Sequence, residues 1–190
     1  MRKKTLVVFI KKQEVIIRPY EKEDLKGLIQ VYKSAFAEPP WNESWSDEDI
    51  IKDLEFAISQ RDPIILVAQN KDGLAGMTWG YKLPIEKFPF LERKVPTNSS
   101  YMDEIAVAGN KRFKGVGTLL GRAYIDIAAQ QNQGIVLRTD DRNEASMTLF
   151  RKLGLKGIPD ITNPKGNIYD PQYQNRIYLM KDLKKEASSK

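Results

Sequence analysis

The stretch YMDEIAVAGNKRFKGVG, residues 101–117, decides how this chain is interpreted. Its apolar run at 105–107 predicts a strand. After Val116, apolar residues recur at offsets 3, 4, 7, 8, 11 and 12, which predicts a helix with one buried face. Between strand and helix lie a basic loop at 111–114 and the glycines of 115–117. Main-chain N–H groups at the start of such a helix favour a bound anion, so the stretch predicts a phosphate or pyrophosphate site.

Two known glycine-rich loops fit less well. A P-loop requires Gly-x4-Gly-Lys-Ser/Thr, which this sequence lacks. A dinucleotide-binding turn is closer, because Gly115, Gly117 and Gly121 nearly match Gly-x-Gly-x-x-Gly, but the third glycine comes one residue too late. In that fold the strand also runs almost directly into the first glycine, whereas seven residues separate Val107 from Gly115 here.

A third pattern, Arg/Gln-x-x-Gly-x-Gly/Ala placed five residues after a strand-end valine, fits residues 112–117 and Val107. The sequence here resembles the coenzyme A site of the GNAT acyltransferase superfamily. A second segment begins at Asn143 and continues as SMTLFRKLGL over 146–155. It resembles that family's Asn-x-x-Ala-x-x-Leu-Tyr-x-Lys-x-Gly-Phe signature. Two motifs at matching spacing make the resemblance stronger than either motif alone.

Composition limits the chemistry. The chain has 190 residues, enough for one domain with a substantial core, and it contains neither cysteine nor histidine. Disulfides, thiolate nucleophiles, serine triads and most transition-metal sites are therefore excluded, and we expect no metal. Residues 1–12 carry a charge of +5 and residues 181–190 carry +2, so 13–180 carry 6 − 5 − 2 = −1. Because the basic excess lies in the tails, we expect no nucleic-acid partner.

The order of predicted elements agrees with the resemblance, which implies an α/β (mixed) GNAT fold: a mixed, mostly antiparallel twisted sheet of about seven strands with about four helices. Residues 14–183 would form this single domain, with 1–13 as an extension and 184–190 as a basic tail. Residues 5–10 form either an extra strand or a plain extension. No apolar run is long enough to span a membrane, so we expect a cytoplasmic protein without a membrane partner. Helix starts are predicted by the Ser46–Asp49 capping box and by Asn143.

The resemblance also implies a cosubstrate, acetyl-CoA, and the residues that would hold it. Main-chain groups of the 105–107 strand would hold the pantetheine arm, and an amide near Val107 would polarise the thioester carbonyl. The amides of 113–118 would bind the pyrophosphate, and the helix at Asn143 would contact the far end of the pantetheine. The cofactor-binding set is Ile105, Ala106, Val107, Arg112, Phe113, Lys114, Gly115, Val116, Gly117, Thr118, Asn143, Ser146 and Phe150.

An amine acceptor would attack the thioester directly and must lose a proton. Asp103 and Glu104 lie just before the oxyanion position, and either could be the base, or could hold a relay water, or could simply cap or pair with a lysine. The family's proton-donating tyrosine falls at position 150, where this chain has phenylalanine. Phe150 leaves the proton donor to water or to a tyrosine elsewhere, for which Tyr101, Tyr169 and Tyr173 are the candidates.

The acceptor is predicted from residues 37–55, which contain seven acids and one lysine, Lys52, for a net charge of −6. Together with Trp41, Glu43 and Trp45, this stretch predicts a site that attracts a cationic small molecule or peptide amine. Tyr101 and Tyr173 are further candidates for contact with the acceptor. Alternatively, the acids merely favour a helix start and the tryptophans belong to the core.

Two functions therefore remain open at this stage. One is an acetyl-CoA-dependent N-acetyltransferase, and the other is a non-catalytic acyl-CoA-binding sensor or assembly module, suggested by Phe150. Homodimers are common in the family, but no residue of this chain points to one.

Overall fold

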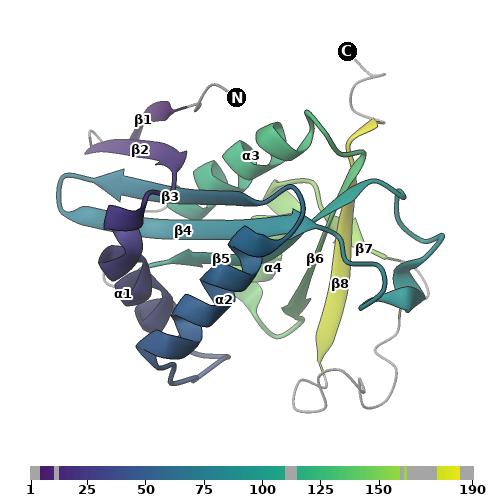
Figure 1. Cartoon of the computed structure of the whole chain (residues 1–190), viewed down its shortest axis with the longest axis horizontal. Coiled ribbons are helices and arrows are strands. Elements are labelled where there is room, and N and C mark those ends of the chain that lie inside the picture. The colour runs from purple at the N-terminus through teal and green to yellow at the C-terminus, as the bar shows by residue number, and fades with distance from the viewer. Residues whose placement is uncertain (1–4, 11–12, 110–114, 159–160, 162–174, 185–190) are drawn as a thin grey trace. The chain divides into compact units, whose positions relative to one another are not determined.

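The computed structural model describes residues 5–10, 13–109, 115–158, 161 and 175–184. These residues form an eight-stranded mixed sheet in the order β1-β2-β3-β4-β5-β6-β8-β7, with four α-helices (Figure 1). The predicted fold class is confirmed. The elements are β1 (Leu6–Ile10), β2 (Gln13–Pro19), η1 (Lys22–Asp24), α1 (Leu25–Phe36), α2 (Asp47–Ser59), β3 (Ile64–Asn70), β4 (Gly73–Lys82), η2 (Pro89–Leu91), β5 (Ser99–Val107), α3 (Val116–Ala128), β6 (Gly134–Asp140), α4 (Glu144–Lys152), β7 (Lys156–Gly157) and β8 (Arg176–Asp182).

Of the eight strands, the sequence left β1 as one of two alternatives and did not predict β7. β1 forms an antiparallel pair with β2, so of the two alternatives for residues 5–10 the structure has the strand. β7 pairs with β8 through Lys156 and Gly157 only. A two-residue strand is too short to show a period-2 pattern, which explains why the sequence did not predict it.

The chain divides into two compact units. The first unit consists of residues 1–81 and 102–127, and the second consists of residues 82–101 and 128–190. Strand β5 contributes its first three residues to the second unit and its remaining residues to the first.

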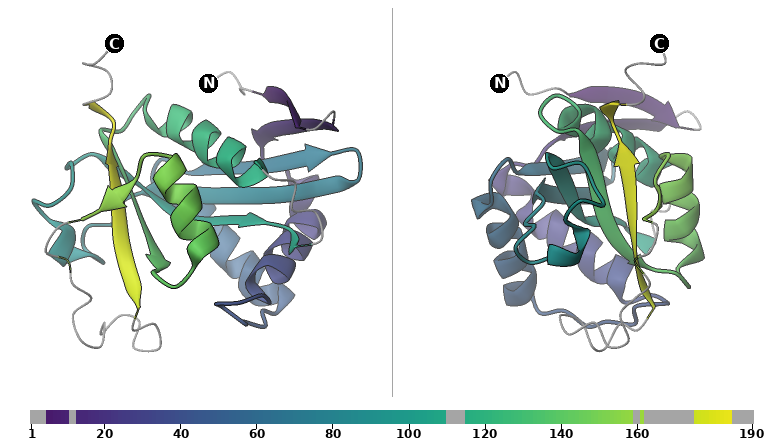
Figure 2. Two further views of the ribbon diagram at one scale, coloured as in Figure 1. Left: turned by 180° about the vertical axis from the view of Figure 1, so that it is seen from behind. Right: turned by 90° about the vertical axis from the view of Figure 1, so that its right-hand side faces the viewer.

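In the first unit, helices lie on both sides of the strands (Figures 1 and 2). On the side of α1 and α2, Trp79 of β4 stacks on Tyr32 of α1, with ring centroids 5.6 Å apart and planes inclined by 14°. On the side of α3, Gly76 of β4 faces Val116 and Leu120. Successive strand side chains point to opposite faces, so residues of β4 face the α1 and α2 side and the α3 side in turn.

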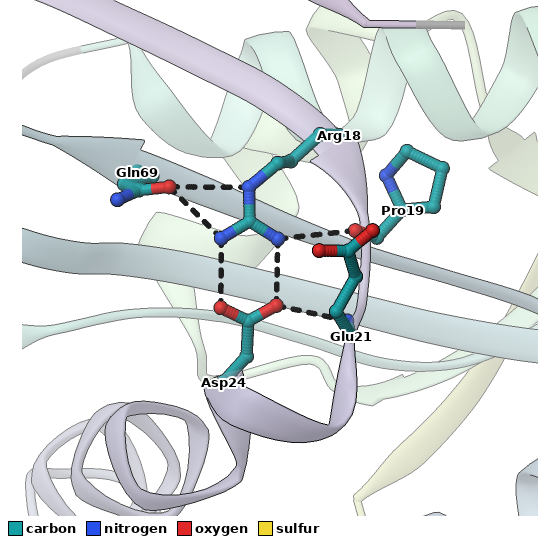
Figure 3. Close-up of polar contacts among 5 residues, drawn as sticks. All are labelled: Arg18, Pro19, Glu21, Asp24 and Gln69. Atoms are coloured by element: carbon teal, nitrogen blue, oxygen red, sulfur yellow. Dashed lines mark hydrogen bonds and ion pairs between the residues drawn. The ribbon is translucent and has the colours of Figure 1, made fainter. Parts of the chain in front are cut away.

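Arg18 of β2 fixes the start of the first helix (Figure 3). Its guanidinium donates to both carboxylate oxygens of Asp24, at 2.6 and 2.7 Å, and to Gln69 Oε1 of β3, at 3.1 and 2.8 Å. Asp24 also accepts from the main-chain N–H of Glu21 at 2.9 Å. The bond from Arg18 is the largest cause that holds the pKa of Asp24 below its ordinary value. The ion pair thus ties β2, β3 and the α1 entry together.

In the second unit, residues 99–101 of β5 pair in parallel with 134–136 of β6. β8 runs antiparallel to both β6 and β7. Phe88 packs on Tyr101, with ring centroids 5.2 Å apart, and on Tyr178 of β8, at 6.1 Å. These rings form part of the core of this unit.

Within the part of the chain that the structure describes, no helix is both long enough and apolar enough to cross a membrane.

Candidate functional site

Strand β5 presents the two predicted acid–base residues, Asp103 and Glu104, both half-buried. Two side chains of β4 contact them. The Tyr81 hydroxyl donates to Asp103 Oδ2 at 3.1 Å, and the Thr78 hydroxyl donates to the main-chain oxygen of Glu104 at 2.7 Å. β4 therefore fixes the carboxylate of one residue and the peptide group of the next.

Tyr81 is itself held in place. Its side chain is 4% exposed, and Phe56 of α2 packs against its ring edge-on, with centroids 5.7 Å apart and planes at 85°. A ring packed in this way keeps its hydroxyl in one position, so α2, β4 and β5 together set the direction of the Asp103 carboxylate.

The start of α3 lies close to both β4 and β5. Gly76 has no side chain, and a Cβ there would lie 2.9 Å from the main-chain oxygen of Ala106 and 2.9 Å from Leu120 of α3. Gly115, just before the helix, has φ 117°, a conformation that favours glycine. These two glycines allow the first turn of α3 to begin close to β5.

The predicted phosphate-binding residues are described only in part. Val116 is buried, whereas Gly117 and Thr118 of the first turn are half-buried. Arg112, Phe113 and Lys114 lie outside the described residues. On β5, Ile105 and Val107 are half-buried and Ala106 is buried. A helix N-terminus preceded by an exposed glycine is suited to an anion, so the described residues fit a diphosphate group here.

The predicted residues of the second unit have local structural roles. The Asn143 side chain accepts from the Ser146 N–H at 3.0 Å and caps α4, as predicted. Ser146 is half-buried and Phe150 is 4% exposed, so the phenyl ring contributes packing and no hydroxyl. Tyr101 is 1% exposed and packs on Phe88. Tyr173 lies outside the described residues.

The predicted acceptor residues of the α1–α2 connection fold back onto α1. The Glu43 N–H donates to the Phe36 carbonyl at 2.9 Å, and the Trp45 indole N–H donates to Glu43 Oε2 at 2.9 Å. Trp45 meets Tyr32 edge-on at 5.5 Å, and Trp41 packs on Phe36 at 6.2 Å. All three residues are half-buried, so each tryptophan both packs on α1 and keeps an exposed part.

Acidic residues from three segments act on the hydroxyl of Tyr32, which is 1% exposed. Burial is the largest cause that raises the pKa of Tyr32, and the negative charges of Glu104, Asp53, Asp103 and Glu43 raise it further. The potential at this face of the first unit is therefore negative, and Tyr32 stays neutral at physiological pH.

Asp53 of α2 shares this environment. Burial raises its pKa first, followed by the charges of Asp103 and Asp49. Like charges that raise a carboxyl pKa are relieved by a bound cation. The sequence placed Asp53 among the seven acids of residues 37–55 without distinguishing it. The sequence did not single out Tyr81 either, because no local pattern shows which residues face each other across β4 and β5.

Comparison with known proteins agrees with this geometry. Residues 28–155 match the model of the acetyltransferase (GNAT) family. The chain belongs to the GNAT acetyltransferase family. The match contains β5, α3 and α4, and so includes both of the predicted motifs. No curated protein matches the sequence.

Solved structures share the GNAT fold at low sequence identity. A putative acetyltransferase from Salmonella typhimurium, solved with its cofactor acetyl-CoA, has 17% identity and a TM-score of 0.67, covering 89% of this chain and 94% of that one. A ribosomal-protein-alanine N-acetyltransferase from Brucella melitensis has 21% identity and a TM-score of 0.64, covering 87% of this chain and 98% of that one. An N-acetyltransferase from Staphylococcus aureus Mu50 has 20% identity and a TM-score of 0.66, covering 89% of this chain and 98% of that one.

Proposed function

We propose that this GNAT protein transfers an acetyl group from acetyl-CoA to a primary amine of a cationic small-molecule or peptidic acceptor. The observation that carries the proposal is the course of the chain from β5 to α3. One strand presents two carboxylates, and the helix that follows begins beside that strand with an anion-favouring first turn. Family membership supports acetyl-CoA as the donor.

Residues of the first unit would hold the donor. The amides of Gly117 and Thr118 would meet the diphosphate, and Arg112 and Lys114 would add positive charge. Main-chain groups from Ile105 to Val107 would hold the pantetheine arm. When bound, the donor supplies a thioester whose carbonyl is polarised by a main-chain N–H near Val107.

The reaction is a direct attack by the amine. A β5 carboxylate accepts the proton of the ammonium group, the nitrogen lone pair forms the N–C bond, and the C–S bond breaks. No acyl-enzyme is required, which suits a chain without cysteine or histidine. The leaving thiolate is a weak base, since a thiol has a pKa of about 8.5. It can therefore depart as the thiolate and take up a proton from bulk solvent afterwards, so no proton donor is required at position 150.

The acids around Tyr32 support a cationic acceptor. Glu43, Asp53, Asp103 and Glu104 all act on the Tyr32 hydroxyl. Aromatic side chains lie on the same face, and a cation gains from contact with both acids and ring faces. An anionic acceptor would be repelled there.

Release of thiol tests the function directly. Because the protein has no cysteine, a thiol-reactive dye reports only coenzyme A. The protein is mixed with acetyl-CoA and with aminoglycosides, polyamines, short peptides, aromatic amines or amino acids. We expect release above the no-amine control with a polycationic class. Release with neutral amines alone would contradict the cationic acceptor and leave acetyl transfer standing.

A second candidate function is a non-catalytic acyl-CoA-binding module, favoured by the buried Phe150 at the position of the family's tyrosine. It predicts that acetyl-CoA raises the melting temperature while no amine releases thiol. Restoring the hydroxyl by Phe150→Tyr would then create turnover. An enzyme that protonates its leaving group from water would gain less than about tenfold from the same substitution.

A further inference from the structure

We propose that the acceptor is a diamine or a longer linear polyamine, and that the Tyr32 hydroxyl and the Asp53 carboxylate bind its non-reacting ammonium group. The inference rests on the proposed function and deepens it, because it names the substrate class and the residues that select it. The reacting amine lies at the acids of β5, whereas Tyr32 and Asp53 belong to α1 and α2, on one side of β4 (Figure 1).

The ring of Tyr32 is fixed by three aromatic neighbours. It stacks on Trp79 with centroids 5.6 Å apart, meets Trp45 edge-on at 5.5 Å and packs on Phe36 at 4.4 Å. The residue is 1% exposed, so packing leaves the ring little freedom. Helix α1, strand β4 and the α1–α2 connection therefore set the direction of its hydroxyl.

The Tyr32 hydroxyl makes no hydrogen bond within the part of the chain that the structure describes. Buried polar groups are nearly always hydrogen-bonded, so this exception requires an explanation. Carboxylates of α2, of the α1–α2 connection and of β5 all act on the hydroxyl. An ammonium group fits this environment, because its N–H donates to the neutral hydroxyl oxygen while the carboxylates balance its charge.

Asp53 lies on the side of α2 that meets β4. Phe56, three residues later, packs on the Tyr81 ring, and the Tyr81 hydroxyl donates to Asp103. Residues three apart are neighbours on a helix surface, so Asp53 lies beside Phe56. The structure thus brings a carboxylate of α2 to the neighbourhood of the β5 acids without placing the two on one element.

The charge of Asp53 is available to a ligand. Its carboxylate makes no hydrogen bond or ion pair among the described residues. Lys52, its neighbour in the sequence, lies 3.9 Å from the Asp49 carboxylate instead. Burial raises the pKa of Asp53, and the charges of Asp103 and Asp49 raise it further. A bound ammonium would relieve this repulsion, since an opposite charge favours the ionised carboxyl.

The spacing along α2 suits a short linear chain. Asp53 lies about 4.5 Å along the helix axis from Phe56, which marks the level of the Tyr81–Asp103 contact. The two nitrogens of extended 1,4-diaminobutane are about 6 Å apart at ordinary bond lengths. Such a chain can place one nitrogen at the β5 acids and the other at Asp53, with its methylene groups against the surrounding rings.

The reaction removes one positive charge from the acceptor and keeps the other. The reacting ammonium passes a proton to a β5 carboxylate and from there to solvent, its nitrogen forms the N–C bond, and the C–S bond breaks to release coenzyme A. The product keeps one ammonium group. Turned end for end, it would place an uncharged acetamide at Asp53, so we expect one acetylation per diamine.

The test compares acceptors of similar length: 1,4-diaminobutane, 4-aminobutan-1-ol, 4-aminobutanoate and 1-aminobutane. Each offers a primary amine, and the difference lies at the far end. Thiol release at saturating acetyl-CoA gives kcat and KM for the wild type, Tyr32→Phe and Asp53→Asn. Tyr32→Phe keeps the stacked ring and removes only the hydroxyl. Tyr178→Phe is the matched control, because Tyr178 is also buried, at 3% exposed, but belongs to β8.

We expect kcat/KM for the diamine to exceed that for the amino alcohol about 20-fold or more, because two contacts recognise the second ammonium. Tyr32→Phe and Asp53→Asn should each raise the KM for the diamine about fivefold. For the amino alcohol and for 1-aminobutane, the KM should stay within about twofold, and so should kcat for every acceptor. Mass spectrometry should find one acetyl group per diamine, and Tyr178→Phe should behave as the wild type.

Equal kcat/KM for the diamine and the amino alcohol would overturn the inference and leave acetyl transfer standing. A rise in the KM of every acceptor alike in Tyr32→Phe or Asp53→Asn would also overturn it, because a purely structural residue behaves in that way. A doubly acetylated product would have the same consequence.

Calorimetry without turnover separates this inference from the proposed function. 1,4-Diaminobutane is titrated into the protein saturated with coenzyme A, which carries no acetyl group to transfer. Binding that weakens about fivefold in Tyr32→Phe and in Asp53→Asn would support the diamine site. If this binding held while no amine released thiol, only the proposed function would fail. Turnover of other amines without any binding of the diamine would overturn the inference alone.

Discussion

Gly76 is the residue on which the approach of α3 to β5 depends. A Cβ at this position would meet the Ala106 main-chain oxygen and the Leu120 side chain, each at 2.9 Å, and Val116 at 3.2 Å. Main-chain oxygen cannot move aside as the end of a side chain can. The absence of one side chain on β4 therefore sets how closely the predicted phosphate site approaches the strand that carries the acids.

We predict that Gly76→Ala lowers the free energy of unfolding by about 1–3 kcal/mol, as overpacking of a core does. It should also raise the KM for acetyl-CoA several-fold, because α3 and β5 move apart. Urea unfolding and steady-state kinetics measure the two effects. Gly157→Ala is the control, since a Cβ there meets nothing within 4 Å. Equal stability of the two variants would contradict the assigned role.

The ionised carboxylate of Asp53 lowers the stability of the folded chain, although its charge suits the binding of a cationic acceptor. Its raised pKa means that the ionised form is less favourable in the folded chain than in the unfolded one. This penalty is present above the folded pKa and disappears as the pH falls through it. Asp53 is an exposed residue, so screening by solvent limits the effect.

We predict that Asp53→Asn raises the stability at pH 7 by less than about 1 kcal/mol, with no gain at pH 4. The KM for a cationic acceptor should rise about fivefold, because a loss of about 1 kcal/mol in binding has that size. Thermal unfolding at both pH values and kinetics with one acceptor provide the data. Glu55→Gln, at an exposed position of the same helix, should change neither quantity. An unchanged KM in Asp53→Asn would remove Asp53 from the acceptor site.

At the scale of elements, the junction of β2 and α1 depends on one ion pair. Asp24 is 9% exposed and accepts two bonds from Arg18, whose pKa rises mainly through the same contact. The pair connects a strand, a neighbouring strand and a helix entry, so its loss should loosen the first unit at α1, the helix that carries Tyr32.

The lowered pKa of Asp24 fixes the sign of a pH effect. Its stabilisation is fully present above the unfolded pKa of about 3.9 and is lost as the pH falls through the lower folded value. We predict that Asp24→Asn costs about 2–3 kcal/mol at pH 7, because Arg18 loses its charged partner. The difference in the free energy of unfolding between this variant and the wild type should become smaller below about pH 3.5. Chemical denaturation at pH values from 7 to below about 3.5 measures this difference. The control variant Glu23→Gln, at an exposed neighbouring position, should be as stable as the wild type.

The elements also show what the sequence could predict. Ser46 caps α2, accepting from the Asp49 N–H at 3.1 Å, and Asn143 caps α4, because each signal lies within four consecutive residues. The period-3.6 pattern predicted the α3 helix, and the apolar run at 105–107 predicted the end of β5, which the structure extends back to Ser99. Such local patterns, with the two family motifs, were sufficient for the fold class.

Contacts between strands could not be predicted in the same way. Tyr81 and Asp103 are 22 residues apart, and their hydrogen bond depends on the register of β4 against β5. The two residues of β7 are defined only by pairing with β8. The candidate base was visible in the sequence, but the residue that holds it required three-dimensional pairing.

At the scale of the whole molecule, net charge and local charge have opposite signs. The chain carries +6 overall, yet residues 37–55 carry seven acids and one lysine. The acids that act on Tyr32 are among the residues of α2, the α1–α2 connection and β5. An approaching cation therefore experiences these nearby acids more than the net charge of the chain, because charges beyond about 10 Å are screened at 0.1 M salt.

This difference predicts that salt raises the KM for a cationic acceptor but not for a neutral one. Between about 0.05 and 0.5 M salt, the KM for a polycationic amine should rise at least several-fold, because its attraction to the acids is screened. The KM for an uncharged aromatic amine should change little, and kcat should stay constant for both if the protein remains folded. Thiol release at fixed pH and saturating acetyl-CoA measures each value, and melting temperatures confirm folding. If both amines lost affinity equally, salt would be acting on the donor or on the fold. If neither changed, the acids of α2 and β5 would have no part in acceptor binding, and the negative potential at Tyr32 would need another explanation.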